Sequence, residues 1–342
     1  MLVVDGSYGE GGGQILRLSV ALSALTKTPI RVKNIRVKRR TPGLRPQHIA
    51  AINSVKELTN AEVEGLDLGS SEVIFRPGRI GGGEFRFDVG TAGSVTLVLQ
   101  ACCLPAMFAE EKVRLRIKGG TDVSYSPPWD YFANVFIPLL SKMGARVSAE
   151  VERRGYFPKG GGEVRVEIEP VETLKPLRIV QAREFQFEGK INISDSLPFD
   201  IAERIGKSAS QAVLRSKMKT PEIEIESGKS FSPGCGVVLW AKSNEAILGS
   251  SALGEKRLPA KRVGYLAGKD LLEEIDAGAT VDVHAFDQLL PYMALAAREG
   301  ASKVLIRDWT AHAKAIQWLI KKFMRVDFLT KKVNSRLEVV IK

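Results

Sequence analysis

Three runs of three glycines, at 11–13, 81–83 and 160–162, punctuate the first half of the chain. The second and third runs open similar stretches, GGGEFRFDV and GGGEVRVEI, in which apolar and polar residues then alternate. Alternation after a glycine turn predicts a half-buried β-strand. A recurring element of this kind predicts a fold assembled from copies of one supersecondary unit.

Three copies of such a unit can be drawn, each with two helices and several strands. The first has an apolar helix after Gly13, then elements near 29–37, 47–59, 61–65 and 72–76; the second has them near 92–108, 112–118, 129–142, 145–152 and 163–169; the third has them near 287–298, 302–306, 310–322, 325–329 and 336–341. We therefore expect an α/β fold of three repeated units, each with two helices on a four-stranded mixed sheet.

The stretch 183–275 does not follow this pattern. It has its own alternating runs at 185–193 and 223–225, an amphipathic helix at 201–214 and an apolar strand at 236–241. Its length is that of a small domain. We expect 1–182 and 276–342 to form a large repeat domain that carries 183–275 as a small α/β inserted domain.

The charge of the chain points to the class of partner. Lys and Arg number 50 against 39 Asp and Glu, a formal net charge of +11. Such an excess predicts a polyanionic partner, namely nucleic acid, nucleotide or an anionic membrane, although an ordinary basic surface remains the alternative. The sequence shows no apolar run of membrane-spanning length and no secretory leader, so we expect no membrane partner and a cytoplasmic location. The three cysteines form no CxxC pair, which argues against a zinc ribbon.

The first glycine run lies in a turn, DGSYGEGGGQ at 5–14, that leads into the apolar helix. Glycines permit close approach of a ligand, and a helix N-terminus offers free N–H groups to phosphate, although a simple tight turn explains the glycines equally well. Glu10 within this turn would repel phosphate unless a metal ion lay between them. Mg²⁺ commonly binds through one or two carboxylates and substrate phosphates.

A basic stretch, 33–48, ends in the sequence RPQH. A strand at 35–37 would place Arg36 and Lys38 on one face, and Gln47 and His48 would follow at a helix start. Arginine binds phosphate through paired hydrogen bonds, so this stretch predicts contact with phosphate or an RNA backbone. A solvated strand end is the alternative.

Three later segments place polar groups at helix starts or on apolar helices. GTAGS at 90–94 precedes a helix in which Gln100 is a lone polar residue, and HAFDQ at 284–288 offers Asp287 as a helix N-cap or a metal ligand. His312 follows a strand and begins a helix, where a neutral imidazole is favoured. A neutral imidazole nitrogen can attack phosphorus and form a phosphoramidate. A surface or capping histidine is the alternative.

Taken together, these segments resemble the RNA 3′-terminal phosphate cyclases. The resemblance is carried in order by GEGGGQ at 9–14, RPQH, GTAGS, GGT and SPP within 119–128, FPKGGG at 157–162, HAFDQ and His312. It implies a fold of three repeated units akin to the enolpyruvyl transferases, with a small inserted domain. It also implies a ligase-type enzyme of RNA processing that uses ATP and Mg²⁺ or Mn²⁺ to convert an RNA 3′-phosphate to a 2′,3′-cyclic phosphate.

The resemblance also implies roles for individual residues. His312 would become adenylylated and pass AMP to the RNA 3′-phosphate, giving an anhydride that the vicinal 2′-OH attacks. Glu10 would hold the metal ion, for which Asp287 is the second candidate ligand from the residue pattern. ATP would contact Gln100, His284, Ala285, Phe286, Asp287 and Gln288, whereas the RNA end and its phosphate would contact Arg17, Arg36, Arg39, Gln47 and His48.

Two features depart from the family pattern, and two other functions compete. The family often has tyrosine where this chain has His284, and a Thr-Asn pair often follows the nucleophile, where this chain has 314–317 as KAIQ. A non-catalytic cyclase-like protein of ribosome assembly is the first alternative, but such relatives lack the nucleophilic histidine. An enolpyruvyl transferase, the second, needs no such nucleophile. The oligomeric state is left open.

Overall fold

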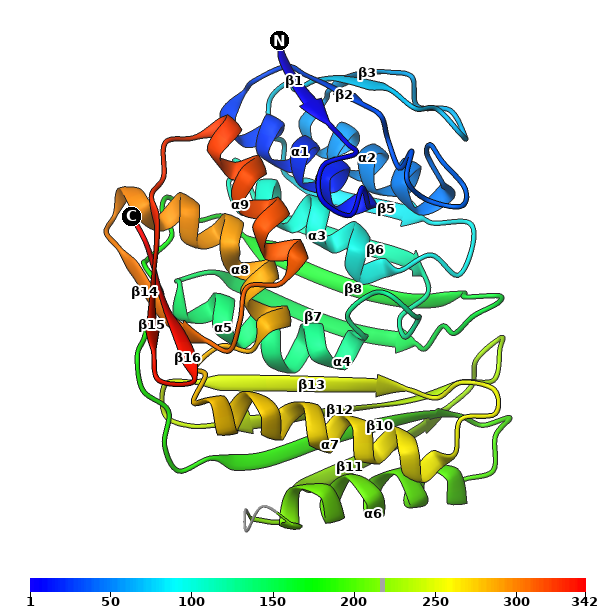
Figure 1. The fold of residues 1–342 in the computed structure, drawn as a ribbon. Coiled ribbons are helices and arrows are strands. Elements are labelled where there is room, and N and C mark those ends of the chain that lie inside the picture. The colour runs from blue at the N-terminus through cyan, green and yellow to red at the C-terminus, as the bar shows by residue number, and fades with distance from the viewer. Residues whose placement is uncertain (216–218) are drawn as a thin grey trace.

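The computed structural model describes residues 1–215 and 219–342, and these form four four-stranded sheets (Figure 1). Three sheets share one strand order, in which the first strand of the unit pairs in parallel with the second. The expected α/β fold of three repeated units is therefore confirmed. The fourth sheet belongs to the segment inserted into the third unit.

The first unit lies at the top of Figure 1 and contains the N-terminus. Alternation buries Ile30 and Val32 on one face of its second strand, and α1 ends where Lys27 adopts a left-handed conformation. Its elements are β1 (Leu2–Asp5), α1 (Gly13–Thr26), β2 (Ile30–Lys33), α2 (Pro46–Thr59), β3 (Glu62–Glu64) and β4 (Val73–Arg76).

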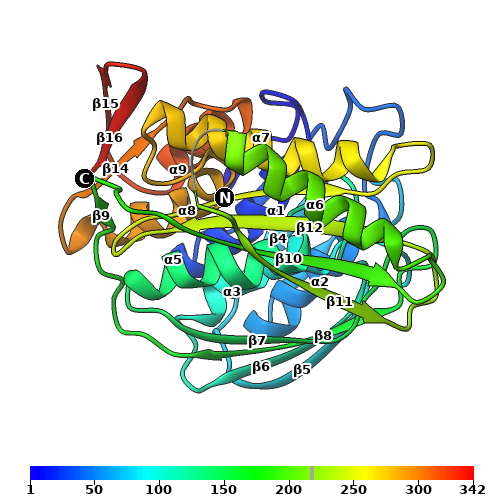
Figure 2. The same cartoon turned by 90° about the horizontal axis from the view of Figure 1, so that it is seen from below.

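The second unit forms a curved outer sheet with α3 and α5 on its inner side (Figure 2). Its second helix is interrupted by a π-helical turn, η1. Its elements are β5 (Gly83–Asp88), α3 (Val95–Ala106), β6 (Val113–Gly119), α4 (Trp129–Tyr131), η1 (Phe132–Phe136), α5 (Ile137–Lys142), β7 (Arg146–Arg153) and β8 (Gly162–Glu169).

The third unit is split by the insertion, which enters after its first strand. That strand, β9, still pairs in parallel with β14, as β1 does with β2. The unit consists of β9 (Arg178–Ile179), α8 (Val283–Leu295), the 3₁₀ turn η2 (Ala296–Arg298), β14 (Ser302–Ile306), α9 (Ala311–Phe323), β15 (Phe328–Val333) and β16 (Arg336–Ile341).

The glycine runs that suggested the repeat do not occupy equivalent places in it. Both later runs do lead into strands, but β5 is the first strand of its unit and β8 the last. Strand β6 runs parallel to β5 and antiparallel to β8, so Gly83 and Gly162 lie at opposite ends of one sheet. The three units are therefore related by their helices and strand order, and not by the positions of the glycine runs.

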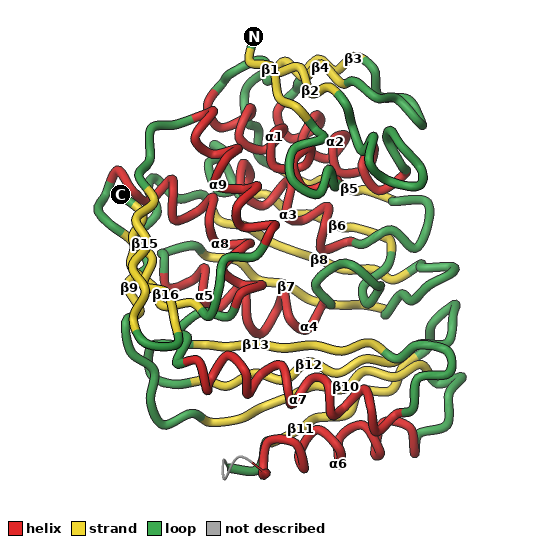
Figure 3. The backbone as a smooth tube through the Cα atoms, in the orientation of Figure 1, coloured by secondary structure: helices red, strands yellow, loops and turns green. Residues whose placement is uncertain are grey.

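The inserted segment builds a sheet of its own at the bottom of Figures 1 and 3, covered on one face by two helices. Its buried side chains form a hydrophobic cluster separate from the main core. The sequence analysis missed β13 and α7. The elements are β10 (Gln186–Ser194), α6 (Asp200–Arg215), β11 (Glu222–Gly228), β12 (Cys235–Lys242), β13 (Ile247–Leu253) and α7 (Ala260–Ala277). The exact limits of the domain, 183–275, stay a prediction.

The main core joins the three repeated units. Helices α1, α3, α8 and α9 gather at the centre of Figure 1, and one hydrophobic cluster contains buried residues of all four. This packing brings the N-terminal ends of helices from different units close together. Among the described residues, no helix is long and apolar enough to cross a membrane.

One sequence prediction in the first unit is wrong. Strand β2 ends at Lys33, and 34–40 form turns and bends instead of continuing the strand. Asn34 and Arg36 both have positive φ, 56° each, which no strand allows. Arg36 and Lys38 therefore lie on a loop and do not share a strand face.

Candidate active site

His312 lies in the first turn of α9, as expected, with an exposed side chain. Thr310 is the N-cap of this helix, and its hydroxyl accepts a hydrogen bond from Ala313 N at 2.9 Å. The imidazole lies between two carboxylates. Nε2 is 3.1 Å from Glu10 Oε2, and Nδ1 is 4.0 Å from Asp287 Oδ2.

The glycine-rich turn carries Glu10 from the first unit to α9 of the third. Asp5 begins the turn by accepting hydrogen bonds from the backbone and hydroxyl of Ser7, which lower the pKa of Asp5. The Tyr8 ring then stacks on Trp318 of α9 with 3.9 Å between centroids. A shallow cavity between turn and helix results, lined by Tyr8, Glu10, Gly11, Gly12, Gln14, Ile15, Ala311, His312 and Ala315.

Asp287 lies in the second turn of α8 and is not an N-cap, so that interpretation is wrong. Asp282 is the N-cap and accepts from the backbone of His284 and Ala285. Asp287 instead accepts a hydrogen bond from the Thr310 hydroxyl at 2.7 Å, which ties α8 to α9. Burial raises the pKa of Asp287 to about 7, and the nearby charges of Asp282 and Glu10 act in the same direction.

Replacing Asp287 with asparagine should stabilise the protein at pH 8 and have less effect at pH 4. Because the folded-state pKa is raised, wild-type stability falls as pH rises from about 4 to about 7, whereas asparagine does not titrate. The gain at pH 8 should be at most about 4 kcal/mol. Urea unfolding at both pH values measures it; a stability difference independent of pH would contradict the raised pKa.

A second part of the site lies beneath the start of α1. His48 and Arg17 are buried there, and a β-carbon added at Gly13 would lie 2.2 Å from His48 Nε2 and 2.9 Å from an Arg17 guanidinium nitrogen. Burial, with help from nearby arginines, lowers the pKa of His48 to about 3, and burial lowers that of Arg17 to about 10. A neutral imidazole and a cationic guanidinium thus adjoin the N-terminus of α1, an arrangement suited to an anion.

The two loop arginines differ in what they contact. Arg39 lies 3.4 Å from Glu10 Oε2, and its guanidinium would be 3.3 Å from a β-carbon at Gly12, so it joins the site. Arg36 instead donates to the carbonyl oxygens of Thr41 and Gly43, at 2.7 and 3.0 Å. The Arg36 guanidinium therefore holds its own loop together.

The remaining expected site residues are less closely joined to His312. Gln47 packs against the GTAGS loop, where a β-carbon at Gly93 would lie 2.9 Å from Gln47 Cβ. Gln100 is half-buried on α3, and no hydrogen bond of its side chain to another described residue is present. Gln47, in the first turn of α2, therefore lies beside the N-terminus of α3, whereas Gln100 lies in the middle of that helix.

The HAFDQ segment presents only some of its side chains. His284 is exposed. Gln288 donates to the His284 carbonyl at 3.1 Å, and its buried Oε1 has no hydrogen-bond partner among residues 1–215 and 219–342. Ala285 and Phe286 are fully buried, with the Phe286 ring against Trp309. Side-chain contact with a nucleotide from this segment is thus restricted to His284, Asp287 and Gln288.

Sequence reasoning missed residues that position this site. Thr310 directly precedes α9, and Asp282 directly precedes α8. A threonine or aspartate in that place is typical of an N-cap, so the sequence could have identified both. No local pattern indicates that Tyr131 donates to Asp282 at 2.5 Å, or that Gly249 of the inserted segment donates to the same carboxylate at 2.9 Å. These contacts join parts of the chain far apart in sequence.

Comparisons with known proteins agree with the motifs. The family model described as RNA 3′-terminal phosphate cyclase matches residues 8–330. Curated relatives named RNA 3′-terminal phosphate cyclase include one from Nitrosospira multiformis, 47% identical over 96% of this chain and 93% of the relative. One from Methanopyrus kandleri is 45% identical over 95% and 94%, and one from Ignicoccus hospitalis is 44% identical over 95% and 93%. The resemblance found from the motifs is confirmed.

Proposed function

Since this chain belongs to the RNA 3′-terminal phosphate cyclase family, we propose that it uses ATP to convert an RNA 3′-phosphate to a 2′,3′-cyclic phosphate through a covalent histidine–AMP intermediate. The observation that carries the proposal is the position of His312. It is an exposed imidazole at a helix start, flanked by Glu10 and Asp287 and adjoining a cavity under a glycine-rich turn.

In the first step, His312 Nε2 attacks the α-phosphorus of ATP. A P–N bond forms, the bond to the β-phosphate oxygen breaks, and pyrophosphate leaves with the electron pair. The attacking nitrogen needs its lone pair, so Nε2 must give up its 3.1 Å contact with Glu10 Oε2 and the proton must be on Nδ1, the atom that faces Asp287. Asp287, held by the Thr310 hydroxyl, is suited to orient that tautomer.

In the second step, an oxygen of the RNA 3′-phosphate displaces histidine from the adenylyl phosphorus and forms a phosphoanhydride. The vicinal 2′-OH then attacks the RNA phosphorus, loses its proton, and expels AMP as the cyclic phosphate closes. This last attack is intramolecular, and good positioning can contribute about 7–11 kcal/mol to it. Arg17, His48 and the N-terminus of α1 supply an anion site where the RNA phosphate can be held.

A divalent metal fits one of the two proposed ligands better than the other. Glu10 is half-exposed, and its contacts with Arg39 and His312 are both made through Oε2, which leaves Oε1 to coordinate an ion completed by phosphates and water. Asp287 is buried, lies on the opposite side of the imidazole and already accepts from Thr310. Within the part of the chain that the structure describes, no cluster of three or more protein ligands is present, so substrate phosphates would have to complete the shell. Mg²⁺ or Mn²⁺ bound there would neutralise the charge of the departing pyrophosphate.

The alternative, a non-catalytic cyclase-like protein of ribosome assembly, is less well supported. Such a protein needs no nucleophile, whereas His312 is present and lies between two carboxylates from separate units. RNA and ATP as substrates, and a cytoplasmic location, belong to the same proposal.

The function is tested by incubating the protein with ATP labelled at the α- or the γ-phosphate. Label from the α-phosphate, and not from the γ-phosphate, should remain on the protein as an acid-labile phosphoramidate. Adding RNA with a 3′-phosphate should discharge it and give a cyclic end that resists phosphatase. A protein that binds RNA but retains no α-label would contradict the proposal.

Glu10→Ala should raise the Mg²⁺ or Mn²⁺ concentration needed for half-maximal adenylation by about 10-fold or more, because a carboxylate ligand is lost. A titration of label incorporation against metal at fixed ATP measures the change. Glu72→Ala, which removes a partly exposed carboxylate elsewhere in the first unit, is the control. An unchanged metal dependence would exclude Glu10 as a ligand.

Arg39→Ala should weaken RNA-dependent turnover more than self-adenylation and flatten its salt dependence. Each lost phosphate contact reduces the slope of log affinity against log salt by about 0.7 for single-stranded RNA. Arg40→Ala, an exposed neighbour, provides the matched control. If adenylation falls as much as cyclisation, Arg39 serves ATP instead of the RNA end.

A further inference from the structure

Three large aromatic side chains are exposed on neighbouring loops of the second unit and the inserted segment. Tyr125 is 102% exposed, Phe157 75% and Phe231 54%. We call these three residues the aromatic rim. Soluble proteins rarely expose such side chains together without a binding role.

The loops of the aromatic rim meet at the N-terminus of α3. A β-carbon at Gly160, in the turn after Phe157, would lie 2.7 Å from Ala92 Cα, and one at Gly120, before the Tyr125 loop, would lie 2.5 Å from Ala92 O. The Phe231 ring packs against the turn that follows Phe157, because a β-carbon at Gly161 would be 2.2 Å from that ring. The three aromatics thus belong to one group of closely packed loops.

This group of loops continues to the proposed phosphate site. Gly93 of the GTAGS loop packs against Gln47, and the next residue, His48, packs beneath Gly13 at the start of α1. A succession of close contacts therefore leads from α1, beside His312, past the GTAGS loop to the aromatic rim.

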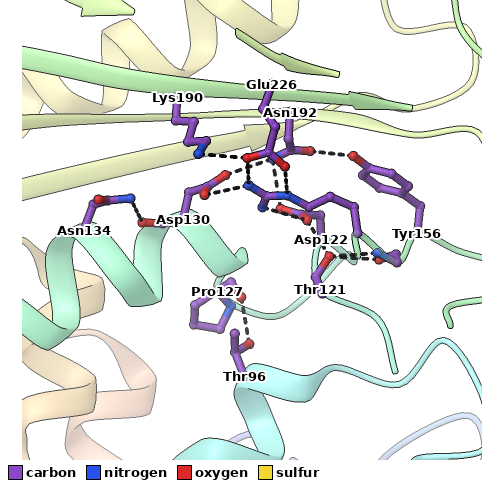
Figure 4. A network of polar contacts seen from close by, with 12 residues as sticks. Thr96, Thr121, Asp122, Pro127, Asp130, Asn134, Tyr156, Lys190, Asn192 and Glu226 are labelled. Atoms are coloured by element: carbon purple, nitrogen blue, oxygen red, sulfur yellow. Dashed lines mark hydrogen bonds and ion pairs between the residues drawn. The ribbon is translucent and has the colours of Figure 1, made fainter. Parts of the chain in front are cut away.

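Buried polar contacts hold the rim loops in place (Figure 4). Asp122 and Asp130, on either side of Tyr125, both accept from Asn192 of the inserted sheet, and both contact Arg154. Tyr156, directly before Phe157, donates to Asn192 at 2.9 Å. The exposed rings thus project from anchored backbone.

Tyr125 is also held in an unusual backbone conformation. Its φ is +65°, a region that a bulky side chain rarely adopts, and such residues cluster at binding sites. This conformation accompanies complete exposure of the ring, so no packing of the ring accounts for it.

Positive charge accompanies the rings. The Arg153 guanidinium lies 4.8 Å from the centre of the Phe231 ring, and Glu163 Oε2, 3.5 Å away, partly neutralises its charge. Lys159 and Lys229 flank Phe157 and Phe231, both are exposed, and neither has an ion pair among residues 1–215 and 219–342. Aromatic side chains on which bases stack, combined with cations for the backbone, are typical of single-stranded nucleic-acid binding.

We propose that the aromatic rim binds the single-stranded RNA segment on the 5′ side of the terminal phosphate, with bases stacked on Tyr125 and Phe157 and the backbone near Arg153 and Lys159. The inserted segment contributes through Phe231 and the anchoring of both loops. This proposal rests on the proposed function for the identity of the RNA end, but the rim can be tested without catalysis.

The test compares a decamer and a dinucleotide that carry the same 3′-phosphate. In the wild type, the decamer should bind more tightly, measured by fluorescence anisotropy without ATP. Tyr125→Ala and Phe157→Ala should each weaken decamer binding by about 5- to 10-fold and leave dinucleotide binding unchanged. Tyr125→Trp should restore binding, because stacking requires a ring and not a hydroxyl.

Controls separate the rim from the catalytic site and from general effects. Leu329→Ala and Lys331→Ala remove an exposed apolar and an exposed basic side chain on β15, and should leave decamer affinity unchanged. Adenylation of His312 by ATP alone should be the same in the rim variants as in the wild type. If the wild type itself is not adenylated, that result would count against the proposed function and not against the aromatic rim. Equal affinity of the wild type for both RNAs, or rim variants with wild-type decamer affinity, would overturn the rim proposal.

Discussion

Replacing His312 with asparagine is expected to abolish label incorporation from α-labelled ATP and to reduce RNA cyclisation by about 10⁴-fold or more, as removal of an enzyme nucleophile does elsewhere. Asparagine retains polarity but has no nucleophilic nitrogen. The side chain is half-exposed, and its polar contacts with described residues are to Glu10 and Asp287. Thermal stability should therefore change by no more than about 0.5 kcal/mol.

The matched control for this variant is Lys314→Asn, an exposed residue two positions further along α9 that contacts neither carboxylate. It should adenylate normally. The decisive measurement is mass spectrometry of the intact protein after incubation with ATP and metal, where the wild type gains one AMP. A histidine variant that gains AMP at the wild-type rate would show that the nucleophile lies elsewhere.

Replacing Arg154 with alanine is expected to cost about 3–5 kcal/mol of stability, because it leaves buried carboxylates without their cation. The guanidinium is 4% exposed and binds Glu226 at 2.9 and 3.0 Å, Asp130 at 2.8 Å and Asp122 at 3.4 Å. Figure 4 shows how this network joins loops of the second unit to β10 and β11.

The effect of this variant should depend on pH. Burial raises the pKa of Asp122, and Arg154 opposes that rise, so its removal should raise the pKa further. A protein becomes less stable as pH increases when one of its carboxyl groups has a raised folded-state pKa. The variant should therefore lose more stability at pH 8 than at pH 5. Urea unfolding at both values tests this, with Arg146→Ala on exposed β7 as the control. If Arg154→Ala lowers the free energy of unfolding by less than about 1 kcal/mol at pH 8, the network does not stabilise the fold as predicted.

The same network explains an acid-sensitive component of stability. Burial alone would raise the pKa of Glu226, but hydrogen bonds from Arg154 and Lys190 bring it down to about 2. The stabilisation is present above the ordinary glutamate pKa and is lost as pH falls toward about 2. Nothing in the local sequence around Glu226 indicates this pairing, because Lys190 lies on β10 and Arg154 directly follows β7.

Local patterns account for most of the predicted elements. Alternation identified β8, apolar periodicity identified α1 and α9, and the unit boundaries followed from their order. The error at Arg36 has a local cause. A run of apolar and basic residues resembles an edge strand, and nothing in it shows that Asn34 and Arg36 adopt a left-handed conformation. Asp287 was misplaced because the true N-cap, Asp282, lies five residues earlier.

The sequence by itself determined the repeated α/β units, the family and the candidacy of His312, because periodicity and ordered motifs are properties of the chain. Only the tertiary structure decided which groups meet. Glu10 comes from the first unit, while Asp287 and His312 come from two helices of the third, and packing of α1, α8 and α9 in one core brings them together. Contacts between side chains so far apart in sequence depend on burial and charge pairing between units. No local sequence pattern encodes those contacts.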